Sequence, residues 1–147
     1  MTNQLFFETM LDLRRHYVSE MDAILNHYQL SSSQWFIFKT IARTAPTTLV
    51  EVAKARAIEK PTATKIIHKL VELKLVETTE GKDKREKILS LTDYGQDIYK
   101  EIQVHVSACQ EESLKDIDLS VDELTAALDT VMHYYKKRKE HRLGRIN

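Results

Sequence analysis

The sequence predicts a mainly α-helical protein with one small β-hairpin. Its 147 residues include only three glycines and two prolines, the residues that most disfavour helices, and 42% of the residues are apolar. Apolar residues recur at steps of three and four over several long stretches, which is the spacing of one helix face. One stretch differs, because two short runs rich in β-branched residues flank a charged segment with a single glycine, as is typical of a hairpin.

The first predicted helix covers residues 5–28 and carries a long apolar stripe with nearly heptad spacing. The stripe consists of Phe6, Met10, Leu13, Tyr17, Met21, Ile24 and Tyr28. A stripe of this length needs another apolar surface to cover it. Packing within the same subunit would provide one, but a chain this short has few other elements, so we expect a second copy to supply the surface.

A second helix begins within residues 30–39, where one of three consecutive serines can cap its first turn. Aromatic residues, Trp35 and Phe36 among them, lie on more than one side of this helix, so we expect most of them in the core. Residues 44–48 then form a loop that leads into a very short strand. The short helix that follows has Thr48 as its cap and turns its apolar side inward.

Residues 49–74 have the pattern of a helix-turn-helix, with residues 56–60 as the turn and Ile58 as its buried residue. The second of the two helices starts at Pro61, because a proline at the first helical position loses no hydrogen bond. Its apolar stripe consists of Ala63, Ile66, Ile67, Leu70 and Leu73. Its other face presents Thr62, Thr64, Lys65, His68 and Lys69. Short hydroxyls and cations reach phosphates and base edges, so this face is a candidate for DNA contact.

A hairpin follows, with strands expected at residues 75–79 and 87–91 and a charged loop between them that turns at Gly81. The positively charged residues of its tip are Lys82, Lys84, Arg85 and Lys87. Asp83 and Arg85 are two residues apart, so in an extended strand their side chains point the same way. We therefore expect Asp83 to hold Arg85 in place, against the simpler interpretation of a solvated charged turn.

Two further helices complete the chain. Thr92 can cap the fifth helix, which extends to about residue 114, and Ser120 with Glu123 forms a capping box at the start of the sixth. The apolar stripe of the sixth helix consists of Leu124, Ala127, Leu128, Val131 and Tyr135. Residues 136–139 are all basic, which suits a helix C-terminus. Such a tail could touch DNA, but packing against the acidic helices of a partner fits the charge distribution better.

Charge is spread unevenly along the chain, although its net value is zero. Residues 54–87 carry ten Lys or Arg against six Asp or Glu, whereas residues 88–135 carry two against ten. The positive charge therefore falls on the second helix of the helix-turn-helix and on the hairpin tip. Phosphate binding requires a local positive field rather than a positive total, so the neutral net charge does not exclude a DNA-binding protein.

The helix-turn-helix, the hairpin and the residues after them resemble the MarR family of transcription regulators, named after multiple-antibiotic resistance. The family pattern is a threonine near the start of the recognition helix, then Asp-x-Arg in the hairpin, then Leu-Thr-x-x-Gly. The matching residues, in the correct order and spacing, are Thr64, Asp83-Lys84-Arg85 and Leu91-Thr92-Asp93-Tyr94-Gly95. The sequence departs from the pattern at Ala57 and Lys74, where the family often has glycine, and at Thr78, where it often has arginine.

The resemblance implies a winged helix-turn-helix subunit, residues 1–147, in which the hairpin is the wing. Residues 31–91 would form the DNA-binding lobe, and residues 1–30 and 92–147 a helical dimerisation region. It further implies a homodimer that binds pseudo-palindromic double-stranded DNA, with Arg85 entering the minor groove, and that acts as a repressor released by an effector. The implied DNA-binding residues are Thr48, Pro61, Thr62, Thr64, Lys65, His68, Lys69, Lys82, Asp83, Lys84, Arg85 and Lys87.

Family members often bind phenolic effectors between the dimer helices and the lobe, so the resemblance implies a pocket for a small aromatic or apolar molecule. Its expected residues are His16, Tyr17, Trp35 and Phe36. These residues suit an ordinary apolar core equally well, because pockets and cores have similar composition. A winged-helix module that binds other proteins and no DNA is the alternative function.

A metal site on the fifth helix is a further alternative, because Glu101, His105 and Cys109 are spaced by four and share a face. Three ligands on one helix rarely converge on one ion, and neither His16 nor His27 has a spacing that completes the set. We therefore expect a structural histidine and a buried thiol near the apolar line of this helix, and no metal or other cofactor.

The remaining features favour a cytoplasmic protein that is not an enzyme. A single cysteine excludes an internal disulfide and suits a reducing compartment. No stretch is long and apolar enough to span a membrane, and the N-terminus lacks the basic and apolar segments of a signal peptide. The sequence contains no phosphate-binding glycine loop and no nucleophile with a base at a motif spacing, so no catalytic residues are expected.

Overall fold

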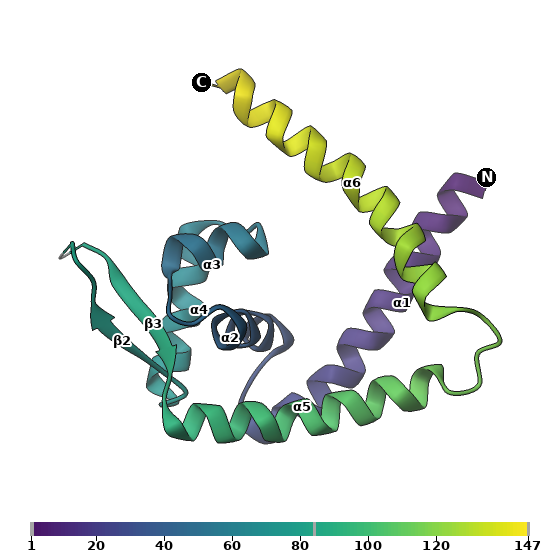
Figure 1. Ribbon diagram of the computed structural model, residues 1–147. Coiled ribbons are helices and arrows are strands. Elements are labelled where there is room, and N and C mark those ends of the chain that lie inside the picture. The colour runs from purple at the N-terminus through teal and green to yellow at the C-terminus, as the bar shows by residue number, and fades with distance from the viewer. Residues whose placement is uncertain (1, 84, 147) are drawn as a thin grey trace. The chain divides into compact units, whose positions relative to one another are not determined.

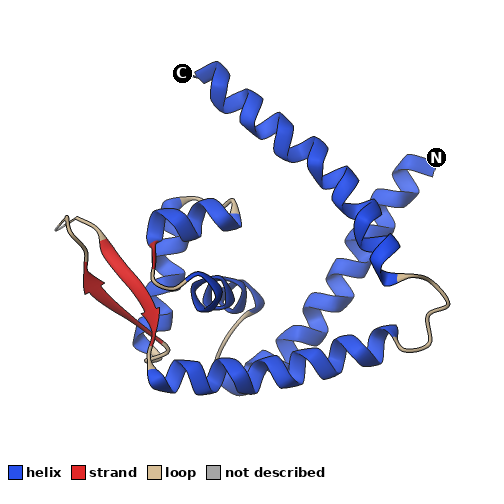
Figure 2. Ribbon diagram, viewed as in Figure 1, coloured by secondary structure: helices blue, strands red, loops and turns tan. Residues whose placement is uncertain are grey.

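The computed structural model describes residues 2–83 and 85–146, with side chains as far as Lys139. It is mainly helical with one small antiparallel sheet (Figure 2), which confirms the predicted fold class. In chain order the elements (Figure 1) are α1 (Thr2–Leu25), the 3-10 helix η1 (Asn26–Tyr28), α2 (Ser32–Thr44), β1 (Thr47–Thr48), α3 (Leu49–Arg56), α4 (Lys60–Glu72), β2 (Val76–Glu80), β3 (Lys87–Leu91), α5 (Asp93–Leu114) and α6 (Val121–Ile146). The chain divides into two compact units, residues 1–110 and residues 111–147.

The core of the first unit gathers around α2, and a capping box fixes the start of that helix. Ser31 Oγ accepts a hydrogen bond from the N–H of Gln34 at 3.2 Å, and Gln34 Oε1 accepts one from the N–H of Ser31 at 2.9 Å. Trp35 and Phe38 are fully buried, and their rings lie 5.5 and 5.8 Å from the ring of Tyr99 in α5. The other buried apolar residues of this core are Met21, Leu25, Leu30, Ile37, Ile41, Val52, Ile67, Leu70, Leu75, Val76, Leu89, Ile102 and Val106.

The sheet has the strand order β1-β3-β2, and both of its strand pairs are antiparallel. β2 and β3 form the predicted hairpin, with Val76 opposite Leu91 at the base and Glu80 opposite Lys87 near the tip. β1 is the expected very short strand, and its Thr48 pairs with Ile88 of β3. The sheet therefore connects the hairpin to the residue that precedes α3.

The first turn of α5 packs directly against the backbone at Leu75. Thr92 caps this helix, because its Oγ1 accepts a hydrogen bond from the N–H of Gly95 at 2.8 Å and donates one to the carbonyl of Lys74 at 2.6 Å. The N–H of Thr92 donates to the carbonyl of Leu75 at 3.1 Å. A Cβ on Gly95 would lie 2.8 Å from the carbonyl carbon of Leu75, which is closer than such atoms can approach. The Leu-Thr-x-x-Gly pattern thus fixes the junction between the hairpin and α5.

Two helices have boundaries that differ from the prediction. The first helix starts at Thr2 rather than residue 5, and its final turn is the separate 3-10 helix η1. α4 starts at Lys60, so Pro61 occupies the second helical position rather than the first. The proline still loses no hydrogen bond there, because the first four N–H groups of a helix have no acceptor within it.

Ala57 and Lys74 adopt left-handed backbone conformations, with φ of 54° and 63°. Ala57 is the C-cap of α3, and Lys74 follows Leu73, the C-cap of α4, so a left-handed residue lies at the end of each helix of the helix-turn-helix. These are the two positions at which the sequence lacks the glycine of the MarR pattern. A residue with a Cβ is strained in this conformation by about 1–2 kcal/mol, and glycine avoids that strain.

We expect Ala57→Gly to raise the free energy of unfolding by about 0.5–1 kcal/mol, because the strain relieved exceeds the entropy that glycine adds to the unfolded chain. The same change at Ala55, inside α3 and without a positive φ, should lower the free energy of unfolding by about 0.5–1 kcal/mol. Urea unfolding of both variants at equal protein concentration measures the two effects. Equal losses in the two variants would show that Ala57 is not strained.

Apolar side chains remain exposed on both terminal helices. In α1, Met21 and Leu25 are buried, whereas Phe6, Met10 and Leu13 are exposed, Leu13 by 68%. Among the described side chains of α6, in the second unit, the exposed large apolar residues are Val121, Leu124, Leu128, Met132, Tyr134 and Tyr135. The apolar stripe expected on α1 is therefore covered only at its C-terminal end. Among the described residues, no helix combines the length and hydropathy needed to cross a lipid bilayer.

Candidate nucleic-acid interface

α4 buries its apolar side and leaves a row of polar residues exposed. Ala63, Ile67 and Leu70 are buried, as the apolar stripe predicts. The residues expected to contact DNA are Pro61, Thr62, Thr64, Lys65 and His68, which are exposed, and Lys69, which is half-buried. The arrangement presents hydroxyl groups, an imidazole and two ammonium groups from one side of a single helix.

Three of these side chains, Lys65, His68 and Lys69, line an open hollow of about 570 Å³. The other residues that line it are Gln34, Ile66 and Glu72. Lys69 Nζ lies 3.9 Å from Glu72 Oε2, and the two side chains are 43% and 67% exposed to solvent. An exposed ion pair of this kind contributes little stability, so Lys69 can exchange the carboxylate for a phosphate at low cost.

Two threonines of the interface are engaged with the backbone. Thr64 Oγ1 donates a hydrogen bond to the carbonyl of Lys60 at 2.9 Å, and Thr48 Oγ1 accepts one from the N–H of Glu51 at 3.3 Å. Thr48 is therefore the N-cap of α3, as predicted. A hydroxyl both donates and accepts, so Thr64 can still accept a hydrogen bond and Thr48 can still donate one to a phosphate.

The wing tip is held by hydrogen bonds between its own residues. The N–H of Gly81 donates to the carbonyl of Glu86 at 2.8 Å, and the N–H of Glu86 donates to the carbonyl of Asp83 at 2.9 Å. Asp83 Oδ1 accepts a hydrogen bond from the backbone N–H of Arg85 at 3.1 Å. Of the wing residues expected to contact DNA, Lys82, Asp83, Arg85 and Lys87 are exposed, and Lys84 lies outside the described residues.

The geometry expected for Asp83 and Arg85 is wrong in one respect. Both residues lie in the turn between β2 and β3, not in an extended strand, so the alternation of side chains does not apply to them. Asp83 instead hydrogen-bonds the backbone two residues further on, which stabilises a turn. Asp83 therefore does brace Arg85, but it fixes the backbone of Arg85 rather than its guanidinium group.

The four residues expected to line an effector pocket lie in different environments. Trp35 is fully buried in the core, and Phe36, the next residue of α2, is half-buried. Tyr17 is half-buried, and its hydroxyl oxygen accepts a hydrogen bond from Gln110 Nε2 at 2.9 Å. His16 is exposed. Of these four side chains, Trp35 is the one that a ligand can reach only after neighbouring side chains move.

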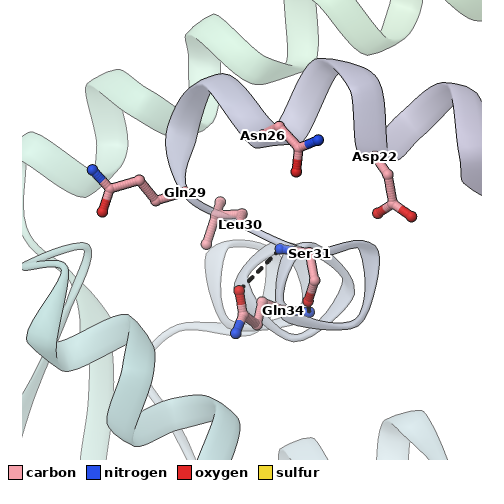
Figure 3. A pocket seen from close by; sticks show the side chains of 6 residues that line it. All are labelled: Asp22, Asn26, Gln29, Leu30, Ser31 and Gln34. Atoms are coloured by element: carbon pink, nitrogen blue, oxygen red, sulfur yellow. Dashed lines mark hydrogen bonds between the residues drawn. The ribbon is translucent and has the colours of Figure 1, made fainter.

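A polar hollow of about 580 Å³ opens where α1 leads into α2 (Figure 3). The residues that line it are Asp22, Asn26, Gln29, Leu30, Ser31 and Gln34. Three of its side-chain oxygen atoms already accept hydrogen bonds: Gln34 Oε1 from the N–H of Ser31, Ser31 Oγ from the N–H of Gln34, and Asp22 Oδ1 from the N–H of Ser32. None of the four residues expected in the effector pocket lines this hollow.

The buried line of α5 agrees only in part with the one expected, which ran through Ile98, Ile102, His105 and Cys109. Ile102 and Val106 are buried, whereas His105 is exposed and Cys109 is only half-buried. The prediction of a histidine near the apolar line is therefore wrong, because the core contacts the side of α5 that carries Val106. Among the described residues, no three His, Cys, Asp or Glu side chains lie together as a metal site requires.

The structure also brings together three cations that the sequence pattern does not single out: Lys39, Arg43 and Arg56, called here the cation cluster. Lys39 and Arg43 are one turn apart on α2, and the guanidinium carbon of Arg56 lies 5.1 Å from the ring centre of Phe36 on the same helix. Burial, and then the charges of Arg43 and Arg56, lower the pKa of the Lys39 ammonium group. The three- and four-residue spacing of Phe36, Lys39 and Arg43 indicates that these residues share a side of α2. No such spacing indicates that Arg56 joins them, because it belongs to another helix.

The exposed polar face of α4, the basic wing that follows it and the sheet that joins the wing to the start of α3 define a winged helix-turn-helix DNA-binding lobe. A family model described as a winged helix DNA-binding domain matches residues 30–95. An HTH-type transcriptional regulator of Staphylococcus aureus is 32% identical over 137 residues, which cover 92% of this chain and 94% of that protein. The structure of Staphylococcus aureus MarR in complex with salicylate and kanamycin matches with a TM-score of 0.81 and 30% identity, covering 95% and 94% of the two chains. The chain belongs to the MarR family of transcriptional regulators.

A DNA complex is known for a more distant protein of the same fold. The structure of reduced AbfR bound to DNA matches with a TM-score of 0.76 and 23% identity, covering 92% of each chain. Because the chain belongs to the MarR family, it is a DNA-binding transcriptional regulator and not an enzyme. Membership of this family also favours DNA binding over the alternative of a winged-helix module that binds only proteins.

Proposed function

We propose that the protein is a repressor that binds a pseudo-palindromic operator as a homodimer and leaves it when a small effector binds. The observation that carries this proposal is that one sheet-linked lobe presents both the polar face of α4 and the basic wing. In a dimer with two-fold symmetry, the two α4 helices would enter successive major grooves about 34–36 Å apart. The protein would act in the cytoplasm, where it meets the DNA.

Each lobe would use α4 in the major groove and the wing in the flanking minor groove. The α4 residues assigned to bases and phosphates are Pro61, Thr62, Thr64, Lys65, His68 and Lys69. Thr48, at the N-terminus of α3, would donate a hydrogen bond from its hydroxyl group to a phosphate. Arg85 would enter the minor groove, with its backbone fixed by Asp83 and with Lys82 and Lys87 adding positive charge near the phosphates.

The exposed apolar residues of α1 and α6 support the proposed dimer. Monomeric proteins rarely expose contiguous apolar patches of more than a few hundred Å². In α1 the stripe is uncovered from Phe6 to Leu13, and in α6 large apolar residues are exposed from Leu124 to Tyr135. An isologous interface in which these helices cover one another would bury both surfaces at once.

Small-molecule binding by a relative supports the proposed effector response. Staphylococcus aureus MarR, at 30% identity, has been solved in complex with salicylate and kanamycin. In the present protein the effector would contact His16, Tyr17 and Phe36, whose side chains have accessible surface. Trp35 would join this set only after a rearrangement of the core, because it is fully buried.

The role of α4 is tested by Lys65→Gln and Lys69→Gln. A lost phosphate contact should weaken binding to every DNA sequence and reduce the slope of log affinity against log salt by ~1 for each variant, whereas a lost guanine contact should relax specificity at one position. Footprinting on the DNA upstream of its own gene supplies the operator, and a salt titration of binding gives the slope. Lys100→Gln, an exposed change on α5, is the matched control. If both α4 variants bind every DNA as the native protein does, α4 does not read DNA.

The role of the wing is tested by a double-mutant cycle of Arg85→Ala and Asp83→Ala. Arg85→Ala should cost about 1–2 kcal/mol of operator binding and leave folding unchanged, because the exposed tip contributes little to the core. Asp83→Ala should cost less, because it acts by releasing the backbone of Arg85. The two losses should therefore not add in the double variant. Additive losses would mean that Asp83 does not act through Arg85.

A further inference from the structure

The cation cluster brings one amine under the influence of two guanidinium groups. Lys39 and Arg43 are one turn apart on α2, and Phe36 lies three residues before Lys39 on the same side of the helix. Arg56 approaches that side from the last turn of α3, with its guanidinium carbon 5.1 Å from the ring centre of Phe36. The charges of both guanidinium groups act on the Lys39 amine. None of the three cations is among the residues assigned to DNA.

The positive charge of the cluster is not neutralised by the side chains that the structure describes. Among these, neither Lys39 nor Arg43 nor Arg56 lies within ion-pair distance of an Asp or Glu. Arg43 and Arg56 are exposed to solvent. The two guanidinium groups are therefore available to an anion from solution.

Lys39 differs from an ordinary surface lysine in how readily it gives a neutral amine. It is half-buried, and its pKa is lowered first by that burial and then by the charges of Arg43 and Arg56. Only the neutral amine has a lone pair with which to attack an electrophile. Desolvation and a cationic neighbour are the two means by which a lysine nucleophile is activated. Because Lys39 is only half-buried, part of it remains open to a small reagent.

The neighbours of Lys39 indicate which electrophile would react there. Guanidinium groups bind phosphates through paired N–H donors, so a phosphate held by Arg43 and Arg56 would bring the group attached to it close to Lys39. They would also stabilise the negative charge on that phosphate as it departs. A small acyl phosphate has both required parts, a phosphate leaving group and an electrophilic carbonyl carbon beside it.

We propose that Lys39 is a site of acylation by small acyl phosphates, with Arg43 and Arg56 holding the phosphate group of the donor. The neutral amine nitrogen of Lys39 forms a bond to the carbonyl carbon, and the bond from that carbon to the bridging oxygen breaks. The phosphate leaves with the bonding electron pair and takes up one proton of the amine, so the products are an amide and hydrogen phosphate. The amide is uncharged, so the modification removes one positive charge from the cluster. No step involves DNA, so this inference does not depend on the proposed function.

Acetyl phosphate is the probe, and Lys100, an exposed lysine of α5, is the internal reference. With about 10 mM acetyl phosphate near pH 8 we expect the full chain to be acetylated at Lys39 roughly five to ten times as fast as at Lys100, because each unit by which a pKa falls gives up to tenfold more neutral amine. Mass spectrometry of peptides cut after glutamate measures both rates, since acetylation does not block that cleavage. Equal rates at the two lysines would overturn the proposal.

The role of the two arginines is tested first on the native protein. Excess inorganic phosphate should slow acetylation at Lys39 and leave the rate at Lys100 unchanged, because it competes for the guanidinium groups. With p-nitrophenyl acetate, an uncharged donor, the preference for Lys39 should fall to about twofold or less, because no phosphate is present to be held. A preference that is the same for both donors, or that phosphate does not reduce, would show that the arginines do not bind the donor.

The same role is tested next by substitution. In the Arg43→Gln/Arg56→Gln variant, the acetylation rate at Lys39 should fall to about that of Lys100. The Arg14→Gln/Arg15→Gln variant, which removes two exposed guanidinium groups from α1, is the matched control and should keep the preference for Lys39. A preference that survives in both variants would overturn the proposal. The phosphate competition is measured on the native chain, so the test remains decisive even if a substitution disturbs folding.

Discussion

Gly95→Ala should remove about 3–5 kcal/mol from the free energy of unfolding, a large share of the 5–15 kcal/mol that holds a typical domain together. The added Cβ would meet the backbone of Leu75, which no change of rotamer can move aside. The clash lies within a set of hydrogen bonds that joins Thr92 to Lys74, Leu75 and Gly95 itself, so separating α5 from this segment would break them too. Thermal and urea unfolding at fixed protein concentration would measure the loss.

Gly81→Ala provides the matched control for this change. A Cβ at Gly81 would lie 3.0 Å from the carbonyl oxygen of Glu86, a contact that an exposed loop can relieve by a small shift. We expect this variant to change the free energy of unfolding by less than about 1 kcal/mol. If Gly95→Ala were tolerated as well as Gly81→Ala, α5 would not need the close approach to Leu75.

Leu13→Glu should convert the protein to monomers and thereby abolish tight operator binding, and Leu128→Glu should have the same two effects. Each change places a charge in an apolar surface that we propose to be buried between two copies, where an unpaired carboxylate is strongly disfavoured. Neither residue belongs to the buried core of its own chain, since Leu13 is 68% and Leu128 is 50% exposed. Each variant chain should therefore still fold. The monomer should bind a single half-site only weakly, because two linked lobes bind DNA far more tightly than one.

Light scattering at micromolar concentration measures the assembly, and a native mass of twice the 17.1 kDa of one chain is the expected result. Ser19→Glu is the control, because Ser19 is exposed and lies about 200° around the helix from the α1 stripe. This variant should remain dimeric and bind the operator. A native mass near 17.1 kDa combined with full affinity for a single half-site would rule out the dimer.

Features set by neighbouring residues were predictable from the sequence. Ser31 and Thr48 cap their helices as expected, because a cap depends on the residue itself and on the first turn that follows. The buried side of α4 follows from its apolar spacing for the same reason. The hairpin was also predictable, since its two strands are neighbours in the chain, although the first strand lies one residue later than expected.

Features that depend on contacts between distant residues were not predictable in this way. Periodicity finds the apolar line of α5 only approximately, so it placed His105 near the core although Val106 takes that position. The contact between Arg56 and Phe36 joins two helices and is not encoded by any local spacing. The Asp83 hydrogen bond was misjudged because it depends on the conformation of a turn, which the sequence of a charged loop does not specify.

The pairing of β3 with both β1 and β2 has a mechanical consequence. Thr48 is paired with Ile88 in the sheet and is also the cap of α3, while Thr92 joins the far end of β3 to the residue that follows α4. The wing is therefore joined to the helix-turn-helix at both ends of β3, to the start of α3 at one end and to the segment after α4 at the other, so we expect it to move together with these two helices. We therefore expect an operator with a wider or narrower groove spacing to be met by tilting the whole lobe, because both ends of β3 are tied to helices.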